Sequence, residues 1–167
     1  MVDKNIRTHC RPEGGLFMKV KDLMTKSVSA CDEQTNLSSA AIMMWDGDCG
    51  ILPMVDEREK VVGVITDRDL SLAMATKNRL SADILVGEIV EKGDIKACSP
   101  DDDVKKALKI MGENQIRRLP VVNEQGQIQG MLSINDLIRH SRADSGELSD
   151  KNVMEAMKAI CSQQAIA

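Results

Sequence analysis

Two stretches of the chain, CGILPMVDEREKVVGVITDRDL (Cys49–Leu70) and IRRLPVVNEQGQIQGMLSINDL (Ile116–Leu137), align without a gap. The offset between them is 67 residues throughout, in polar segments as well as apolar ones. The matched residues with special backbone or polar properties are Pro53 and Pro120, Gly63 and Gly130, and Asp69 and Asp136. A constant offset of this kind indicates an internal repeat, and it decides the architecture of the chain.

The repeat continues upstream of both stretches. The same offset relates Ala30-Cys31 to Ala97-Cys98, and KDLM (Lys21–Met24) matches GEIV (Gly87–Val90) with one residue slipped. We therefore expect five segments: a flexible leader at 1–17, repeat 1 at 18–77, a linker at 78–84, repeat 2 at 85–143 and a tail at 144–167. The tail contains an amphipathic helix (Ser149–Ile160) that either docks on the repeats or binds a partner.

Each repeat predicts a short helical turn followed by the order β-α-β-β-α, from the spacing of its apolar residues. In repeat 1 the expected elements are a turn at Val20–Met24, a strand at Val28–Ala30, a helix from Leu37 to Met44, strands at Ile51–Val55 and Val61–Ile65, and a helix that begins at Thr66. In repeat 2 they are Val86–Val90, Ile95–Ala97, Val104 to Met111, Leu119–Val122, Ile128–Leu132 and a helix that begins at Ser133. Three strands are too few to close a core well, so this mixed α/β fold predicts two halves packed across a pseudo-twofold axis.

Composition excludes several classes of protein. The net charge is −4, whereas a general nucleic-acid binder carries a basic surplus. One Phe, one Trp and no Tyr provide no stacking platform for single strands. The apolar runs are too short to span a membrane.

The five cysteines form no CxxC pair, which favours reduced thiols and a cytoplasmic location. The two histidines, His9 and His140, lack the spacing of metal ligands.

One polar motif occurs in both repeats, as Thr66-x-x-Asp69 and as Ser133-x-x-Asp136. Each copy ends a predicted strand and opens a predicted helix. The free N–H groups at a helix N-terminus favour an anion such as phosphate, and the aspartate can accept hydrogen bonds from a ribose diol. The same residues also form a capping box, which needs no ligand. Both interpretations stay open from the residues alone.

The repeated pattern, an apolar-Pro-Val strand followed by Gly, two apolar residues and [ST]-x-x-D, resembles the cystathionine-β-synthase (CBS) domain over about residues 18–140. The resemblance implies a disc-like pair of domains (a Bateman module) with two clefts, each built from both repeats. It also implies a regulatory ligand that contains adenosine: AMP, ADP, ATP, S-adenosylmethionine or NAD. It further implies a homodimer formed through helices near the second helix of each repeat; the apolar positions at Leu72–Met74 fit such an interface and equally fit a core.

The resemblance assigns residues to two clefts by matching position. The first cleft would use Met131, Ser133, Asn135, Asp136, Arg117, Arg118, Thr25, Val28, Ala30 and Gly50. The second would use Val64, Thr66, Arg68, Asp69, Ile95, Ala97 and Ile116.

The two predicted clefts differ in positive charge. Arg117-Arg118 provide forked guanidinium groups that suit phosphate oxygens. Repeat 1 has Gly50-Ile51 at the matching positions, so only Arg68 can compensate there. We therefore expect the Asp136 cleft to be the better site for a polyphosphate.

No residue pattern predicts catalysis, because the aspartates are matched with no nucleophile, metal cluster or Walker-type loop. The sequence thus favours a regulatory module that binds and senses an adenine nucleotide and is not an enzyme. The alternative is a dimerisation or docking scaffold whose clefts are vestigial.

Overall fold

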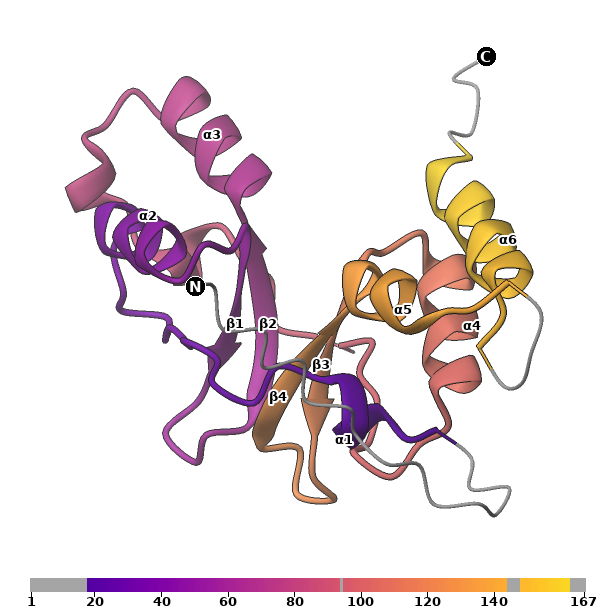
Figure 1. Ribbon diagram of the computed structural model, residues 1–167. Coiled ribbons are helices and arrows are strands. Elements are labelled where there is room, and N and C mark those ends of the chain that lie inside the picture. The colour runs from indigo at the N-terminus through magenta and orange to yellow at the C-terminus, as the bar shows by residue number, and fades with distance from the viewer. Residues whose placement is uncertain (1–17, 94, 144–147, 163–167) are drawn as a thin grey trace, which may run out of the picture.

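The computed structural model describes residues 18–93, 95–143 and 148–162 (Figure 1). The predicted leader at 1–17 lies outside these ranges. Repeat 1 contains α1 (Val20–Leu23), α2 (Leu37–Asp46), β1 (Ile51–Val55), β2 (Val61–Thr66) and α3 (Asp67–Thr76). Two short 3₁₀ helices follow, η1 (Ser81–Asp83) and η2 (Val86–Glu88). Repeat 2 contains α4 (Val104–Asn114), β3 (Arg118–Val122), β4 (Ile128–Ser133) and α5 (Ile134–His140), and the tail contains α6 (Asp150–Cys161). The mixed α/β class and the paired repeats are confirmed.

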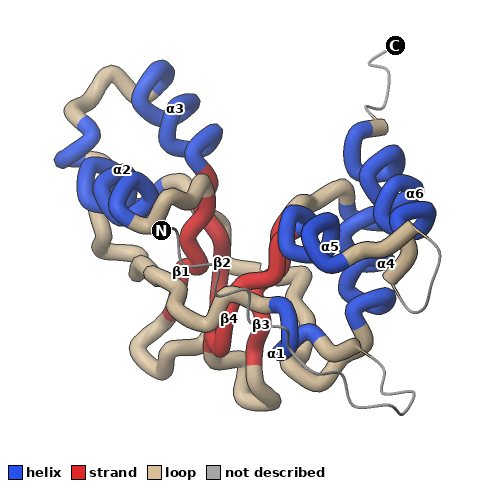
Figure 2. Tube along the Cα trace, in the orientation of Figure 1, coloured by secondary structure: helices blue, strands red, loops and turns tan. Residues whose placement is uncertain are grey.

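Each repeat contains one antiparallel hairpin, with Pro53 opposite Val64 in repeat 1 and Pro120 opposite Met131 in repeat 2. Figure 2 shows the two hairpins side by side in the centre, with α2 and α3 on one side and α4, α5 and α6 on the other, where α1 also lies. The hairpin turns meet, because Val61 N–H donates to Gly126 O at 3.0 Å. The matching residue of Gly126 is Glu59, and both adopt a positive φ, 81° and 62°. The two repeats therefore join around a pseudo-twofold axis at these turns.

The predicted strands at Val28–Ala30 and Ile95–Ala97 are wrong. Only the next residue in each repeat pairs with its hairpin, as a single parallel bridge from Cys31 to Met54 and from Cys98 to Val121. The reason in repeat 1 is that the segment starts on the other sheet, where Thr25 pairs with Met131. A segment that crosses between two sheets cannot run along either of them for long enough to form a ladder.

The repeats exchange their leading segments. Val20 of α1 is fully buried in the core of repeat 2, and Val86 of η2 is fully buried in the core of repeat 1. The two contacts match atom for atom: Val20 N–H donates to Asp102 O at 3.0 Å, and Val86 N–H donates to Thr35 O at 2.8 Å. The core of repeat 2 is therefore completed by α1, at the start of repeat 1, and the core of repeat 1 is completed by η2, at the start of repeat 2.

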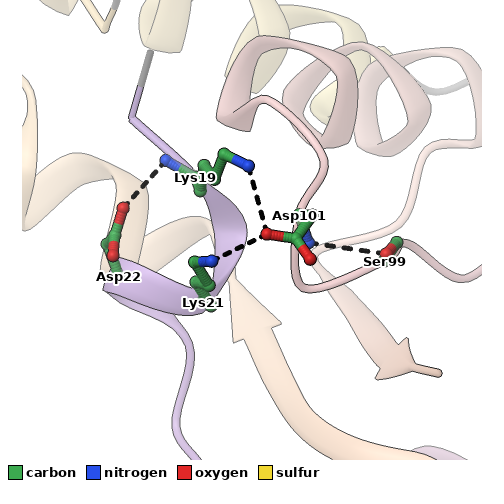
Figure 3. A network of polar contacts seen from close by, with 5 residues as sticks. All are labelled: Lys19, Lys21, Asp22, Ser99 and Asp101. Atoms are coloured by element: carbon green, nitrogen blue, oxygen red, sulfur yellow. Dashed lines mark hydrogen bonds and ion pairs between the residues drawn. The ribbon is translucent and has the colours of Figure 1, made fainter. Parts of the chain in front are cut away.

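An ion-pair network lies outside the first of these exchanges (Figure 3). Lys19 Nζ and Lys21 Nζ both approach Asp101 Oδ1, at 3.1 and 2.7 Å. Hydrogen bonds from Lys21 and then Lys19 lower the pKa of Asp101. All three side chains are exposed, so the network orients α1 against repeat 2 while burial of Val20 provides most of the stabilisation.

The tail helix α6 docks on repeat 2. Of the two roles that its sequence allows, docking on the repeats or binding a partner, the structure shows the first. Its buried residues Val153 and Ile160 belong to the core of that repeat. Gly112 of α4 faces α6, and a Cβ at this position would make an ordinary contact at 3.6 Å with Cβ of Ala159. Repeat 1 has Trp45 at the matching position, and this residue is 86% exposed. The helical face of repeat 1 is not covered in this way by the described residues.

Gly130 is required where the segment after α1 lies against β4. A Cβ at this position would lie 2.7 Å from the backbone oxygen of Thr25 and 2.8 Å from Met24 Sδ. We expect Gly130→Ala to lower the free energy of unfolding by about 2 kcal/mol, as overpacking against backbone does. Denaturant titration measures this value. Gly93→Ala is the matched control, since a Cβ at that position would meet no atom within 4 Å, and its effect should be small. Equal stability of the two variants would contradict a tight exchange.

Candidate functional site

A cavity of about 750 Å³ lies between the two repeats. Its walls come from the starts of β1 and β3, the ends of β2 and β4, and the first turns of α3 and α5. The lining residues are Gly50, Ile51, Val64, Thr66, Asp67, Arg68, Ile95, Lys96, Gln115, Ile116, Arg117, Arg118, Pro120, Ser133, Ile134 and Asn135. Both copies of the repeated motif therefore open into one shared space.

The two motifs form capping boxes at the N-termini of α3 and α5. In repeat 1, Thr66 N–H and Thr66 Oγ1 donate to Asp69 Oδ2 at 2.9 and 2.6 Å. In repeat 2, Ser133 N–H and Ser133 Oγ donate in the same way to Asp136 Oδ2, at 2.9 and 2.6 Å. The capping interpretation is therefore confirmed for both copies. Thr66 and Ser133 line the cavity, and the aspartates that hold them do not.

Asp136 is a buried carboxylate, only 6% exposed. Burial alone would raise its pKa, but hydrogen bonds from Ser133 and the nearby Arg139 guanidinium outweigh it and lower the pKa. The charged form is therefore the stable one in the folded chain, and its two oxygens are available only as acceptors.

Positive charge gathers around the cavity although the whole chain is acidic. Four cationic residues line it, Arg68, Lys96, Arg117 and Arg118, against one acidic residue, Asp67. The chain as a whole has a net charge of −4. A concave surface with this local excess attracts an anion, and guanidinium groups bind phosphate or carboxylate oxygens through two parallel hydrogen bonds.

Repeat 1 has Gly50-Ile51 where repeat 2 has Arg117-Arg118, and Gly50 lies against the side chain of Asp67. Arg117 O accepts a hydrogen bond from Ile134 N–H at 2.9 Å, and Gly50 O accepts the matching bond from Asp67 N–H at 3.2 Å. At Gly50, however, a Cβ would lie 2.7 Å from Asp67 Oδ2. The Asp67 side chain is exposed and contacts Gly50, and Arg68 is the cation that this half presents to the cavity.

The structure brings many of the predicted site residues together and leaves others outside. Those that line the cavity are Gly50, Val64, Thr66, Arg68, Ile95, Ile116, Arg117, Arg118, Ser133 and Asn135. Those that do not are Thr25, Val28, Ala30, Asp69, Ala97, Met131 and Asp136. Ala97 lines a different hollow of about 250 Å³. The two predicted clefts thus contribute to a single cavity, in which the arginine pair and Thr66 take part together.

Sequence reasoning missed Lys96, which lies between the predicted residues Ile95 and Ala97 and lines the cavity. Matching to the family pattern gave no signal for it. Gln115 was also missed; it adopts a left-handed conformation with φ of 54° at the C-terminus of α4, a position that the spacing of apolar residues does not reveal.

Other candidate sites have structural explanations. The Cys31 and Cys98 thiols are buried, and burial raises their pKa to about 11 and about 12, so both stay protonated and behave as small apolar residues. Residues 18–93, 95–143 and 148–162 contain no cluster of three or more potential metal ligands. Within the same ranges, no helix is long and apolar enough to cross a membrane.

The fold and the cavity define a tandem-repeat α/β module with one cavity shared by the two repeats. The profile of the CBS domain matches twice, at residues 20–76 and 86–143. The chain belongs to the CBS domain family. An uncharacterised protein from Bacillus subtilis, YlbB, is 33% identical over 120 residues, which cover 71% of this chain and 79% of that protein. Hypoxic response protein 1 from Mycobacterium tuberculosis is 28% identical over 147 residues, 88% of this chain and 96% of that one.

Solved structures of similar proteins include CBS domain pairs with bound ligands. The CBS domain pair of protein MJ0100, solved with 5-methylthioadenosine and S-adenosyl-L-methionine, has a TM-score of 0.66 and 25% identity, and the match covers 74% of this chain and 95% of that one. Hypoxic response protein 1, solved with two coordinated zinc ions, has a TM-score of 0.67 and 26% identity, covering 75% and 100%.

The lowered pKa of Asp136 predicts a pH dependence of stability. A carboxylate whose pKa falls on folding stabilises the fold above its unfolded pKa, about 3.9, and this contribution is lost as the pH falls through the folded value. We expect Asp136→Asn to lower the free energy of unfolding by about 1 kcal/mol at pH 7. The difference from the wild type should shrink below about pH 4. Denaturant titrations across this range measure it.

Glu155→Gln, on the exposed part of α6, is the control and should unfold like the wild type throughout. A difference between Asp136→Asn and the wild type that stays constant with pH would contradict the stabilising role of the charge.

Proposed function

We propose that the chain is a regulatory module that binds an adenosine-containing ligand in the cavity between its repeats. The observation that carries this proposal is the concentration of four cationic residues at a cavity that also receives the capped N-terminus of α3. The similar CBS domain pair of MJ0100, solved with two adenosine compounds, supports the choice of ligand class.

The phosphate and the purine of such a ligand have counterparts among the residues that line the cavity, and the ribose has one in the aspartates bonded to Thr66 and Ser133. Phosphate oxygens would meet the guanidinium groups of Arg117 and Arg118, which line the cavity. The purine would lie against the apolar side chains of Val64, Ile95 and Ile116. The ribose hydroxyls would donate to a motif aspartate next to Thr66 or Ser133. AMP, ADP and ATP all satisfy this arrangement, and S-adenosylmethionine or NAD would use the adenosine part of it.

The module is proposed to regulate without catalysing a reaction. The hydroxyl groups of Thr66 and Ser133 donate to aspartates that also accept from the backbone, as caps do. A nucleophile needs a base that can take its proton, and a carboxylate with a lowered pKa, such as Asp136, is a poor one at neutral pH. Ligand binding would act instead by favouring one relative position of the two repeats.

Thermal or denaturant unfolding with AMP, ADP, ATP, NAD and S-adenosylmethionine tests the binding. At a ligand concentration 100 times the dissociation constant, we expect a stabilisation of about 2.7 kcal/mol. Changing both Arg117 and Arg118 to alanine should reduce the stabilisation by ATP more than that by adenosine, because only ATP brings phosphate. Lys151→Ala, exposed on α6, is the matched loss of a cation away from the cavity. Stabilisation by none of the five compounds would contradict the proposal and favour the scaffold alternative.

We further propose that the chain forms a homodimer through the exposed face of α2 and α3. This face has large apolar residues in contact with solvent: Ile42 at 60%, Trp45 at 86%, Leu72 at 52% and Met74 at 47% exposed. The corresponding face of repeat 2 is covered by α6. A second copy would cover an apolar surface that a monomer leaves in water.

Trp45→Lys tests this interface, since a charge at its centre would have to be buried unpaired. We expect the wild type to sediment as a dimer at micromolar concentration and the variant to dissociate at least tenfold more readily. Met154→Lys, at a position 57% exposed on α6, is the control and should leave the dimer intact. Because Trp45 is the single tryptophan, its fluorescence reports on the same surface. A wild type that sediments as a monomer would exclude the interface.

A further inference from the structure

The two motif aspartates differ in one contact. Asp136 Oδ1 accepts a hydrogen bond from Arg139 Nη2 at 2.6 Å, in addition to the two bonds that Ser133 donates to Oδ2. Asp69 Oδ2 accepts the same two bonds from Thr66, but its Oδ1 has no donor among the described residues. One carboxylate oxygen is therefore occupied in repeat 2 and open in repeat 1.

The difference follows from a single position of the repeat. Arg139 lies three residues after Asp136, one turn further along α5, and its guanidinium reaches back to the carboxylate. The matching residue in repeat 1 is Leu72, which lies three residues after Asp69 on α3 and has no side-chain donor. The Arg139 side chain is 71% exposed, whereas the Asp136 side chain is 8% exposed. Arg139 therefore closes the carboxylate from the solvent side.

Resting on the proposed binding of an adenosine ligand, we propose that Arg139 competes with the ribose diol for Asp136. A diol presents two donors side by side, and a carboxylate takes both most readily when one oxygen still has its lone pairs free. Asp69 meets this condition without any rearrangement. At Asp136 the diol must first displace Arg139 from Oδ1. The half of the cavity next to Asp69 therefore binds adenosine more tightly than the half next to Asp136.

The size of this difference is limited by the exposure of Arg139. An ion pair with one solvent-exposed partner contributes little, so competition with it weakens binding by about two- to fivefold. The consequence is a graded response: the first ligand binds next to Asp69, and the second binds next to Asp136 only at a higher concentration. This order is opposite to the one expected from the arginine pair alone, and it applies to the sugar whether or not the ligand has a phosphate.

A reciprocal exchange of the two residues tests the proposal in the full-length chain. Arg139→Leu gives repeat 2 the residue of repeat 1, and Leu72→Arg does the reverse; neither side chain belongs to the core. Because Leu72 also belongs to the proposed dimer face, sedimentation of Leu72→Arg checks that its assembly matches that of the wild type. Calorimetric titration with adenosine and with AMP measures both dissociation constants. We expect Arg139→Leu to tighten the weaker constant for adenosine by about two- to fivefold and Leu72→Arg to weaken the tighter one by a similar factor. Asp69→Asn should remove the tighter site, and Asp136→Asn the weaker one.

The outcomes separate this inference from the proposed function. If the wild type binds but the two exchanges leave both constants unchanged, the competition by Arg139 is excluded while the ligand site stands. If Arg139→Leu weakens AMP and leaves adenosine unchanged, Arg139 is a phosphate ligand and not a competitor. If neither compound binds to the wild type or to any variant, the proposed function and the inference both fail. Circular dichroism of each variant confirms that a lost site is not a lost fold.

Discussion

The exchange of segments between the repeats is the constraint on which the rest of the structure depends. Val20 fills the core of repeat 2 and Val86 fills that of repeat 1, so each half is closed by the segment that leads into the other. The exchange also brings Thr25 against β4, where only a glycine at position 130 leaves room. With the two hairpins held together in this way, the ends of β2 and β4 face the same space and their helices begin at its wall. The cavity is thus a product of how the repeats interlock.

Within that frame, the two halves of the cavity differ through a few side chains. Repeat 1 has Gly50-Ile51 where repeat 2 has Arg117-Arg118, so the arginine pair occurs only in repeat 2. Arg139 occupies a carboxylate oxygen that Leu72 leaves open in repeat 1. Under the proposed function these two differences act on separate parts of a nucleotide, because the guanidinium groups next to the cavity would bind phosphate whereas the aspartates would accept from the sugar. A ligand with many phosphates would therefore favour the half of the cavity with the arginine pair, and a ligand with none would favour the half next to Asp69.

Most of the architecture could be predicted because it depends on local periodicity and on the constant offset of the repeat. Apolar spacing places the helices and hairpins within a few residues, as with Val104 to Met111 in α4. The segments at 28–30 and 95–97 could not be predicted, because their alternating apolar residues look like strands and only the crossing between sheets prevents a ladder. The capping boxes and Arg117-Arg118 followed from sequence motifs. The contact of Arg139 with Asp136 did not, because the motif ends before position 139 and says nothing of which oxygen is free.

The matched exchange has a consequence for how the two halves have diverged. If each repeat were a separate chain, two copies that exchange their leading segments would form this arrangement as a symmetric dimer. In such a dimer every substitution appears twice, so a tryptophan on the outer helix or an arginine on the last one would be present on both sides. Joining the copies in one chain removes that coupling. Gly112 can then accept a covering helix while Trp45 stays in contact with solvent, and a single molecule acquires two sides with different tasks.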